Sequence, residues 1–324
     1  MSSIAPSTPR VSAAVLNFNG RALLEVVLPT LAAQEFDDVE MIVIDNCSSD
    51  DSVEYLQREW PNVRVVPTGE SNVGVAAALN VGVQAARGEL IALLNNDIEL
   101  DPRWLGELVA TLDRYPEAAT AAGKLLSYHD RERIDAAGDV FTTAATALGR
   151  GHGELDRGQY EREEEIFAPT GGAGLYRASA FADVGPFDES FRAYFEDVDW
   201  GLRAQLAGHR SRYVPGSIGY HMGGATTGGD KRPDYYELQR RNAIGVIVKD
   251  VPARFLMRHA PAIAWNQLLG FAYGVHAGML VAHLRALRGA ARAFPGWRRE
   301  RRRIMGSRRI ALDDFERFTS AKRD

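Results

Sequence analysis

The chain contains little cysteine and no long apolar run. Cys47 is the single cysteine among 324 residues, so no internal disulfide can form, and this composition is typical of a reducing compartment. We expect Cys47 to fill a turn rather than to act as a catalytic thiol. No window of about 20 uninterrupted apolar residues exists, so the sequence predicts no membrane-spanning helix. No signal-peptide pattern is visible, and the polar residues 1–10 are predicted to form a disordered tail.

The overall composition is that of an ordinary globular protein, with 45% hydrophobic and 25% charged residues. The length suits one large domain, or one domain with an extension. The net charge of −5 is unevenly distributed, because residues 250–324 carry 15 Lys or Arg and 6 Asp or Glu. That segment has a net charge of +9 and the remainder −14. A basic tail on an acidic body indicates that the tail meets a negatively charged surface.

Short apolar runs alternate with segments of helical spacing over the first 122 residues. The predicted strands cover residues 11–16, 39–44, 63–66, 90–94 and 118–122. The predicted helices cover residues 21–33, a segment capped by Ser49 or Asp50 and ending near Arg58, residues 73–86, and a helix opened by Pro102. This alternation predicts an α/β fold with a mostly parallel central sheet and helices on both faces.

Polar residues follow several of these strands directly, at Asn17, Asp45 and 95–97. Open α/β sheets place ligands at the carboxyl ends of their strands, so we expect a binding cleft at this edge. From residue 126 to 168 the pattern breaks down, and we expect irregular strands and a mobile loop over the cleft.

Three acids, Glu196, Asp197 and Asp199, stand at the predicted start of a helix that runs to Leu206. Acids there can offset the helix dipole. They can also provide a general base and a neighbour to a metal site. Bulky apolar residues flank the acids, which argues against a merely solvated face. His221 follows 24 residues after Asp197, behind a strand-like segment.

The order and spacing of seven elements resemble glycosyltransferase family 2, and most of all its bacterial rhamnosyltransferase-type members. The elements are Val-Leu-Asn-Phe-Asn at 15–19, Asp-Asn-Cys-Ser-Ser-Asp at 45–50, Asn-Val-Gly at 72–74, Leu-Asn-Asn-Asp at 94–97, Thr-Gly-Gly-Ala at 170–173, Gly-Pro-Phe-Asp-Glu at 185–189 and Phe-Glu-Asp-Val-Asp at 195–199. The resemblance covers roughly residues 11–221. It implies a GT-A (nucleotide-diphospho-sugar transferase) fold, with a catalytic domain at 11–235 and a helical, basic C-terminal extension at 236–324.

The resemblance also implies a pyrimidine-nucleotide site. The carboxylate of Asp45 is expected to accept a hydrogen bond from the pyrimidine N3–H, although an Asx turn at the strand end would also explain it. Asn72 and Gly74 are expected near the base and ribose, and Asn72 can equally cap a helix. The implied nucleotide-binding residues are Asn17, Asn19, Asp45, Asn72, Gly74 and Asn96.

Residues 95–97 occupy the place of the family's D-x-D motif, in which Asn95 replaces the first Asp. An amide oxygen binds a hard cation more weakly than a carboxylate does, so the resemblance assigns Mg²⁺ or Mn²⁺ to Asp97 and His221. A satisfied core histidine is the alternative for His221. The glycine-rich segment 223–229 is expected to form a flexible flap near the diphosphate.

Asp197 is the expected general base, with Glu196 orienting it or binding acceptor hydroxyls. Asp199 is expected to pair with Arg203 at i, i+4, and Trp200 to pack in the core. Thr170, Gly171 and Gly172 are expected to lie beneath the acceptor or the donor sugar, although a tight turn with positive φ would also explain the glycines. Residues 240–242 are expected to reach either the diphosphate or solvent.

Residues 253–292 read as one or two long helices, followed by the basic run 298–303. We expect an interfacial anchor in which apolar side chains enter the headgroup region and arginines bind anionic lipid. A solvated helical face is the alternative. No nucleic-acid motif accompanies the arginines, so no nucleic acid is expected. The residues expected at the interface are Trp265, Leu268, Leu269, Phe271 and Tyr273.

The resemblance implies an inverting, metal-dependent and non-processive transferase. It implies a UDP- or dTDP-sugar donor, with dTDP-L-rhamnose the first expectation, and a glycan or lipid-linked glycan acceptor in cell-surface polysaccharide synthesis. A cytoplasmic location, with peripheral contact to the inner face of the membrane, follows from this. Two alternatives stay open: a sugar nucleotidyltransferase, and a catalytically inactive scaffold with the same fold.

Overall fold

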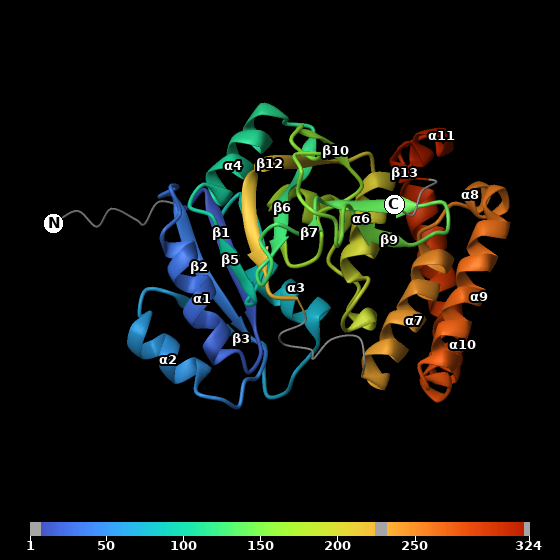
Figure 1. Cartoon of the computed structure of the whole chain (residues 1–324), viewed down its shortest axis with the longest axis horizontal. Coiled ribbons are helices and arrows are strands. Elements are labelled where there is room, and N and C mark those ends of the chain that lie inside the picture. Colours follow the sequence, from blue (N-terminus) through green and yellow to red (C-terminus); the bar gives the residue numbers. More distant parts are fainter. Residues whose placement is uncertain (1–7, 224–231, 321–324) are drawn as a thin grey trace.

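The computed structural model of the chain describes residues 8–223 and 232–320. Most of the expected N-terminal tail (residues 1–7) and most of the expected glycine-rich flap (residues 224–229) lie outside the described residues. Figure 1 shows a central sheet with helices on both sides, and a group of C-terminal helices at the end of the molecule opposite β2 (Val39–Asp45) and α2 (Ser52–Glu59).

The main sheet has ten strands, and its core is parallel. β1 (Val11–Asn17) pairs in parallel with β2 and with β4 (Leu90–Asn95), and β2 pairs in parallel with β3 (Arg64–Pro67). The order continues from β4 through β11 (Ala173–Arg177), β6 (Ala118–Ser127) and β12 (Arg210–His221) to β10 (Glu164–Ile166). β5 (Ile98–Leu100) joins β12, and β7 (Ile134–Ala136) joins β6. Because β1, β2 and β4 run in parallel, their carboxyl ends meet at one edge.

Two sets of helices cover the two faces of this sheet. α1 (Arg21–Ala32), α2 and α4 (Trp104–Arg114) share one apolar core with β1 and β4. α3 (Val75–Ala85), α5 (Ala178–Val184) and α6 (Glu196–Leu206) form a second core on the other face. In α1 the buried residues are Leu24, Val27, Leu28 and Leu31, the spacing that places one apolar stripe against a sheet.

The expected α/β architecture is confirmed, with differences at several element ends. α2 begins at Ser52 with Asp51 as N-cap, although Asp50 still accepts a hydrogen bond from the Ser52 backbone N–H at 3.1 Å. Pro102 precedes α4 rather than opening it. Asn72 does not cap α3, because Gly74 occupies that position. These ends differ because periodicity locates the body of a helix better than its first turn.

The segment from residue 126 to 168 contains short strands, as expected. β8 (Asp139–Thr142) and β9 (Ala147–Gly149) pair with each other, and β8 also pairs with β13 (Thr319–Ser320) in a small second sheet. This sheet therefore joins the middle of the chain to its C-terminal part.

The C-terminal part contains more helices than expected. α7 (Pro233–Lys249) runs across residue 235, where the sequence placed the end of the catalytic domain. Residues 253–292 fall into three helices, α8 (Ala253–Arg258), α9 (Ala260–His276) and α10 (Leu280–Ser307), and the last of these includes the basic run. The break before α10 contains Gly278 at φ +70°, a conformation that favours glycine. Among the described helices, none combines the length and apolar character needed to cross a bilayer.

A buried ion network fastens α6 to α7. The predicted pair between Asp199 and Arg203 is confirmed, with Arg203 Nε 2.9 Å from Asp199 Oδ2. Lys249 Nζ lies 2.6 Å from Asp199 Oδ1 and also pairs with Asp188. Burial by itself would raise the pKa of Asp199, but Arg203 and Lys249 hold that pKa below its usual value. Trp200 lies in the core, as expected.

Replacing Asp199 by Ala should therefore lower the free energy of unfolding by about 3–5 kcal/mol, because the buried Arg203 loses its carboxylate partner and Lys249 loses one of its two. Urea denaturation measures this loss. Asp113→Ala is the matched control, since it removes a half-exposed partner of Arg10 and should cost only about 0–1 kcal/mol. Equal losses in the two variants would contradict the structural role of the network.

Candidate functional site

Two adjoining cavities open at the carboxyl edge of the parallel strands. The larger has a volume of about 750 Å³ and the smaller about 400 Å³. Four residues line both cavities: Val75, Asn95, Ala193 and Tyr194. The predicted residues in the larger cavity are Asn72, Gly74, Asn96, Asp97 and His221, and those in the smaller are Thr170, Gly171, Gly172, Glu196 and Asp197. The fold thus gathers most of the predicted site into one divided cleft.

Three predicted nucleotide-binding residues do not line this cleft. Asn17 is fully buried, and its Oδ1 accepts a hydrogen bond from Asn96 Nδ2 at 2.8 Å. Asn19 Oδ1 accepts from the backbone N–H of Ser49 at 2.6 Å, and Asp45 Oδ2 accepts from that of Ser48 at 3.1 Å. The structure therefore places all three as supports of the loop after β2. Asn19 and Asp45 accept from backbone N–H groups of this loop, and Asn17 Nδ2 donates to the Ser48 side chain at 3.2 Å.

Asn46 lines the larger cavity, although the sequence analysis did not predict it as a site residue. Its Nδ2 donates to Asn72 Oδ1 at 3.3 Å, and its Oδ1 accepts from the Val73 backbone N–H at 3.0 Å. Its position directly after Asp45 was the signal that could have identified it. Gly74 has φ +91°, and a Cβ there would lie 2.8 Å from the Arg192 carbonyl oxygen, so this turn requires glycine. Gly223, the first residue of the predicted flap, lines the larger cavity, and the unpredicted residues that line it alone are Leu16, Phe18, Arg192, Asp234, Tyr235 and Leu238.

Asp97 and His221 face each other in the larger cavity, as the metal prediction requires. Asp97 Oδ1 is buried and has no hydrogen-bond partner, and it lies 3.4 Å from His221 Nε2. His221 Nδ1 lies 2.8 Å from Asp135 Oδ2. A carboxylate behind an imidazole is the usual support for a metal-binding histidine. No group of three or more acidic, His or Cys side chains suited to a metal occurs in the described part of the chain, so a cation here would need oxygens from a bound ligand.

The protonation of His221 depends on these two acids. Burial alone would lower the pKa of His221, but its contacts with Asp135 and Asp97 outweigh burial and raise the pKa to about 10. The imidazolium therefore contributes stability that is fully present below about pH 6.5 and is lost as the pH rises through about 10. A cation bound at Nε2 has to displace this proton.

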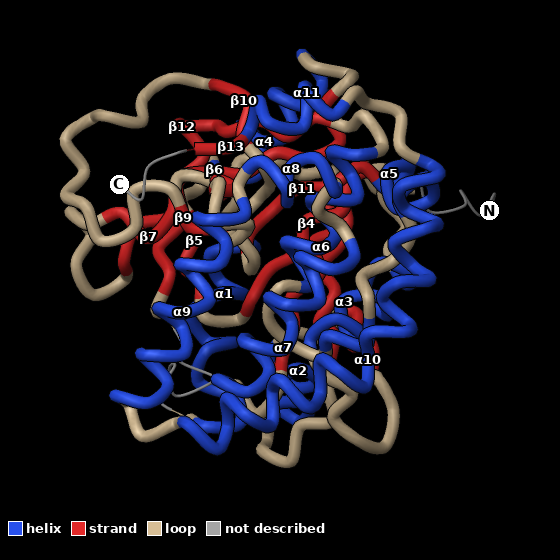
Figure 2. Tube along the Cα trace, turned by 90° about the vertical axis from the view of Figure 1, so that its right-hand side faces the viewer, coloured by secondary structure: helices blue, strands red, loops and turns tan. Residues whose placement is uncertain are grey.

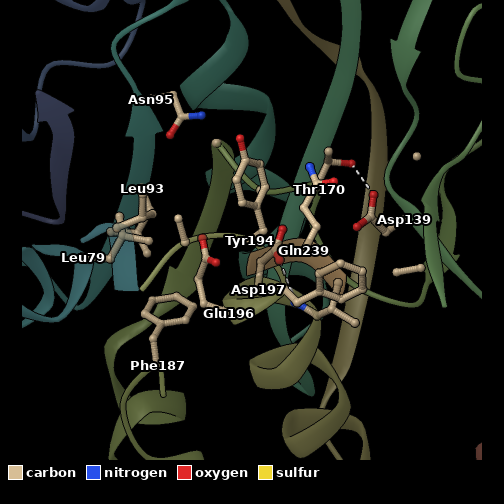
Figure 3. Close-up of a pocket in the computed structure, with 18 of the residues that line it drawn as sticks. Leu79, Leu93, Asn95, Asp139, Thr170, Phe187, Tyr194, Glu196, Asp197 and Gln239 are labelled. Carbon is tan, nitrogen blue, oxygen red and sulfur yellow. Dashed lines mark hydrogen bonds between the residues drawn. The ribbon is translucent and has the colours of Figure 1, made fainter. Parts of the chain in front are cut away.

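The smaller cavity is lined by three carboxyl groups, of which only two were predicted. Glu196 and Asp197 come from the first turn of α6, and Asp139 comes from β8 (Figure 3). Burial raises the pKa of Glu196 to about 8, and the charge of Asp197 adds to the effect. Burial, followed by the charge of Asp197, likewise raises the pKa of Asp139 to about 8. Burial also raises the pKa of Asp197, which is the condition that suits a general base.

The predicted turn at 170–172 approaches these acids closely. A Cβ on Gly171 would lie 2.3 Å from Asp197 Oδ2, and one on Gly172 would lie 2.6 Å from Asn95 Nδ2. Gly172 also has φ +109°, so the expected positive φ is present. Glycine is required here because any side chain would displace the carboxylate or the amide.

A strained loop separates the two cavities. Arg192, Tyr194 and Phe195 have φ values of 60°, 66° and 69°, which non-glycine residues seldom adopt. The Asn242 side-chain amide stabilises this loop by donating to the carbonyl oxygens of Phe191, Ala193 and Tyr194, each at 2.9 Å. Asn242 is fully buried, so both expectations for it, contact with the diphosphate or with solvent, are wrong.

Neither neighbouring arginine is simply solvated. Arg241 Nη1 donates to the Ser190 carbonyl oxygen at 2.9 Å, and Arg240 Nη2 donates to Gln267 Oε1 at 2.9 Å. Neither arginine lines the two cavities.

Comparisons with known proteins identify relatives of this chain. A family model described as Glycosyl transferase family 2 matches residues 12–185. An N-acetylglucosaminyl-diphospho-decaprenol L-rhamnosyltransferase of Mycobacterium tuberculosis is 31% identical over 237 residues, which cover 64% of this chain and 74% of that protein. The O-antigen biosynthesis protein RfbC of Myxococcus xanthus is 31% identical over 212 residues, which cover 63% of this chain but only 16% of RfbC.

Solved structures support the GT-A fold. S. aureus TarS 1–349 in complex with UDP has a TM-score of 0.56 at 17% identity, with 95% of this chain and 91% of that chain covered. GalNAc-T7 with UDP, GalNAc and Mn²⁺ has a TM-score of 0.59 at 16% identity, with 75% and 48% covered. At these identities the likeness concerns the fold alone.

Replacing Asp135 by Asn should lower the pKa of His221 toward the ordinary histidine value of about 6.5, because one of two supporting carboxylates is lost. Imidazole ¹H–¹⁵N correlation spectra recorded against pH measure this midpoint. Asp183→Asn removes the carboxylate beside His209 and should leave the His221 midpoint unchanged. An unaltered midpoint in Asp135→Asn would show that Asp135 does not control the proton.

Proposed function

The chain belongs to glycosyltransferase family 2, and from this premise we propose that it is an inverting, metal-dependent enzyme. In this proposal it transfers a sugar from a UDP- or dTDP-sugar to a hydroxyl of a glycan or lipid-linked glycan. Family membership makes the chain a glycosyltransferase and sets aside the nucleotidyltransferase and inactive-scaffold alternatives. The observation that carries the proposed mechanism is that Asp197 lines the cavity next to the one that contains Asp97 and His221.

The proposed reaction is a single displacement. The acceptor hydroxyl loses its proton to Asp197 as its oxygen bonds to the anomeric carbon, and the bond from that carbon to the nucleoside diphosphate breaks on the opposite face. Such proton transfer contributes about 10²–10⁴-fold to the rate. Mg²⁺ or Mn²⁺, held by Asp97 and His221, would offset the charge that develops on the leaving diphosphate. Glu196, with its raised pKa, is available to bind acceptor hydroxyls or to orient Asp197.

The donor we propose first is dTDP-L-rhamnose, with UDP-hexoses second. The name of the mycobacterial relative describes transfer of L-rhamnose to N-acetylglucosaminyl-diphospho-decaprenol, which supports a similar donor and a lipid-linked acceptor here. RfbC is named for O-antigen biosynthesis, which supports a role in cell-surface polysaccharide synthesis.

An acceptor on a lipid would require the enzyme to reach a membrane surface, and α9 with the start of α10 is suited to this. Gly274 is the single buried residue of α9, whereas Trp265 and Leu268 are 62% and 60% exposed. Figure 2 looks onto these helices. We propose that the exposed apolar side chains enter the headgroup region while nearby arginines contact anionic lipid. The arginines are Arg254, Arg258, Arg285, Arg288 and Arg292.

Asp197→Asn tests the reaction, because the amide keeps the shape of the side chain but cannot accept the proton. We expect transfer from dTDP-L-rhamnose or UDP-glucose to octyl glycosides to fall at least about 10²-fold. UDP or dTDP with Mg²⁺ or Mn²⁺ should still stabilise the variant, by about 2.7 kcal/mol at 100 times the dissociation constant. Product chromatography and thermal unfolding measure the two effects.

Asp130→Asn, a change at an exposed carboxylate, is the matched control and should leave transfer intact. If Asp197→Asn retains turnover, Asp197 is not the general base. If no pyrimidine nucleotide stabilises the wild-type protein with either metal, the proposed donor site is wrong.

Replacing both Trp265 and Leu268 by Ser should weaken membrane binding roughly tenfold or more, because each large apolar side chain contributes about 1.5–3 kcal/mol on full burial. Co-sedimentation with vesicles that contain phosphatidylglycerol measures the partition. Leu155→Ser, at an exposed leucine between β9 and β10, is the control. Binding that is equal in the double variant and the control, or that does not weaken with added salt, would refute this surface.

A further inference from the structure

Asp139 is a site residue that no sequence pattern indicated. It belongs to β8, in the segment where strand and helix periodicity is lost, and it is 6% exposed at the wall of the smaller cavity. Figure 3 shows Asp139 with Thr170 on one side of Asp197 and Glu196 on the other. The three carboxyl groups therefore line the one cavity in which the proposed function places the attacking hydroxyl.

Two consecutive residues hold Asp139 and Asp197 side by side. Thr170 Oγ1 donates to Asp139 Oδ1 at 2.8 Å, and Gly171 lies against the Asp197 carboxylate, where a Cβ would come within 2.3 Å of Oδ2. The turn at 170–171 therefore contacts both carboxyl groups. Because Gly171 has no side chain, both groups can approach the same small volume.

The surroundings of Asp139 indicate that a ligand satisfies it. Its interactions within the described residues are with Thr170 and backbone groups, while the nearest charged groups are the acids Asp197 and Asp135. Across the cavity, Glu196 Oε2 is buried and has no hydrogen-bond partner. Buried carboxyl groups in such surroundings are costly unless donors reach them. Sugar hydroxyls are neutral donors that fit two adjacent carboxyl groups.

The two sides of the cavity differ in character. Leu79, Leu93 and Phe187 line it on the side of Glu196, whereas the polar Thr170 lies beside Asp139 on the other side. Asp139 would therefore bind a hydroxyl on the β8 side of the cavity, opposite Leu79, Leu93 and Phe187.

We propose that Asp139 recognises the acceptor sugar: it binds the hydroxyl next to the one that Asp197 deprotonates, so the enzyme selects acceptors with two adjacent free hydroxyls. This assignment rests on the proposed function, in which Asp197 is the general base. Asp139 is a specificity-determining residue in this scheme, and Thr170 positions it. The inference narrows the proposed acceptor from any glycan hydroxyl to a sugar that carries two adjacent free hydroxyls.

The test compares full and deoxygenated acceptors with the whole protein, using dTDP-L-rhamnose or UDP-glucose and a panel of octyl glycosides. For a glycoside that accepts sugar, the wild-type KM should rise roughly tenfold or more when the hydroxyl beside the reacting one is removed. Asp139→Asn should show a similar rise with the full acceptor, a kcat within about threefold of wild type, and no further penalty from deoxygenation. Donor hydrolysis by water should be unchanged.

Asp130→Asn, in the exposed loop before β7, is the matched control and should behave as wild type. The wild-type comparison needs no variant, so it decides the question even if Asp139→Asn folds poorly. An unchanged wild-type KM for the deoxygenated acceptor overturns the proposal. So does a variant that loses donor hydrolysis in proportion to transfer. If the wild-type protein glycosylates nothing in the panel, the proposed function fails, and the assignment of Asp139 fails with it.

Discussion

The contact between Lys249 and Asp199 is the interaction on which the site depends. α6 presents Glu196 and Asp197 to the smaller cavity, whereas Asp199 and Arg203, one turn apart, form a buried ion network away from it. Removing charges from water is expensive, and the cost is offset only when every partner is in place. The network therefore fixes how far α6 is rotated, and that rotation decides which acids face the cavity.

The same helix that supplies Lys249 also fixes the loop between the cavities. Asn242 and Lys249 are seven residues apart, about two turns, so they lie on one face of α7. Asn242 stabilises the strained backbone around Tyr194, and Lys249 holds α6. The family match ends at residue 185, yet Glu196, Asp197, His221 and Asn242 all follow it. The C-terminal helices are thus part of the machinery that shapes the cleft, in addition to any role at a membrane.

Buried carboxyl groups are the main electrostatic feature of the cleft. Two carboxylate oxygens are buried and make no hydrogen bond: Asp97 Oδ1 in the larger cavity and Glu196 Oε2 in the smaller. Asp139, Glu196 and Asp197 all have raised pKa values, chiefly because they are buried. In the proposed function, the ligands would bring a cation to one cavity and hydroxyl donors to the other. These are the two demands that nucleotide-sugar transfer makes.

The sequence alone determined the features that arise from local pattern. Alternating apolar runs predicted the parallel strands, and polar residues at their ends predicted the cleft edge. The spacing of Asp199 and Arg203 predicted their pair, because residues one helical turn apart are neighbours in any helix.

Only the tertiary structure decided which polar side chains face the cleft. It turned Asn17, Asn19 and Asp45 into supports of a loop, and it brought Asn46, Asp135 and Asp139 to the site. Asp135 meets His221 across 86 positions of the chain, and Asp139 meets Thr170 across 31. Periodicity records which face of an element is buried, but contacts over such separations depend on how whole elements pack. They leave no repeating trace in the sequence.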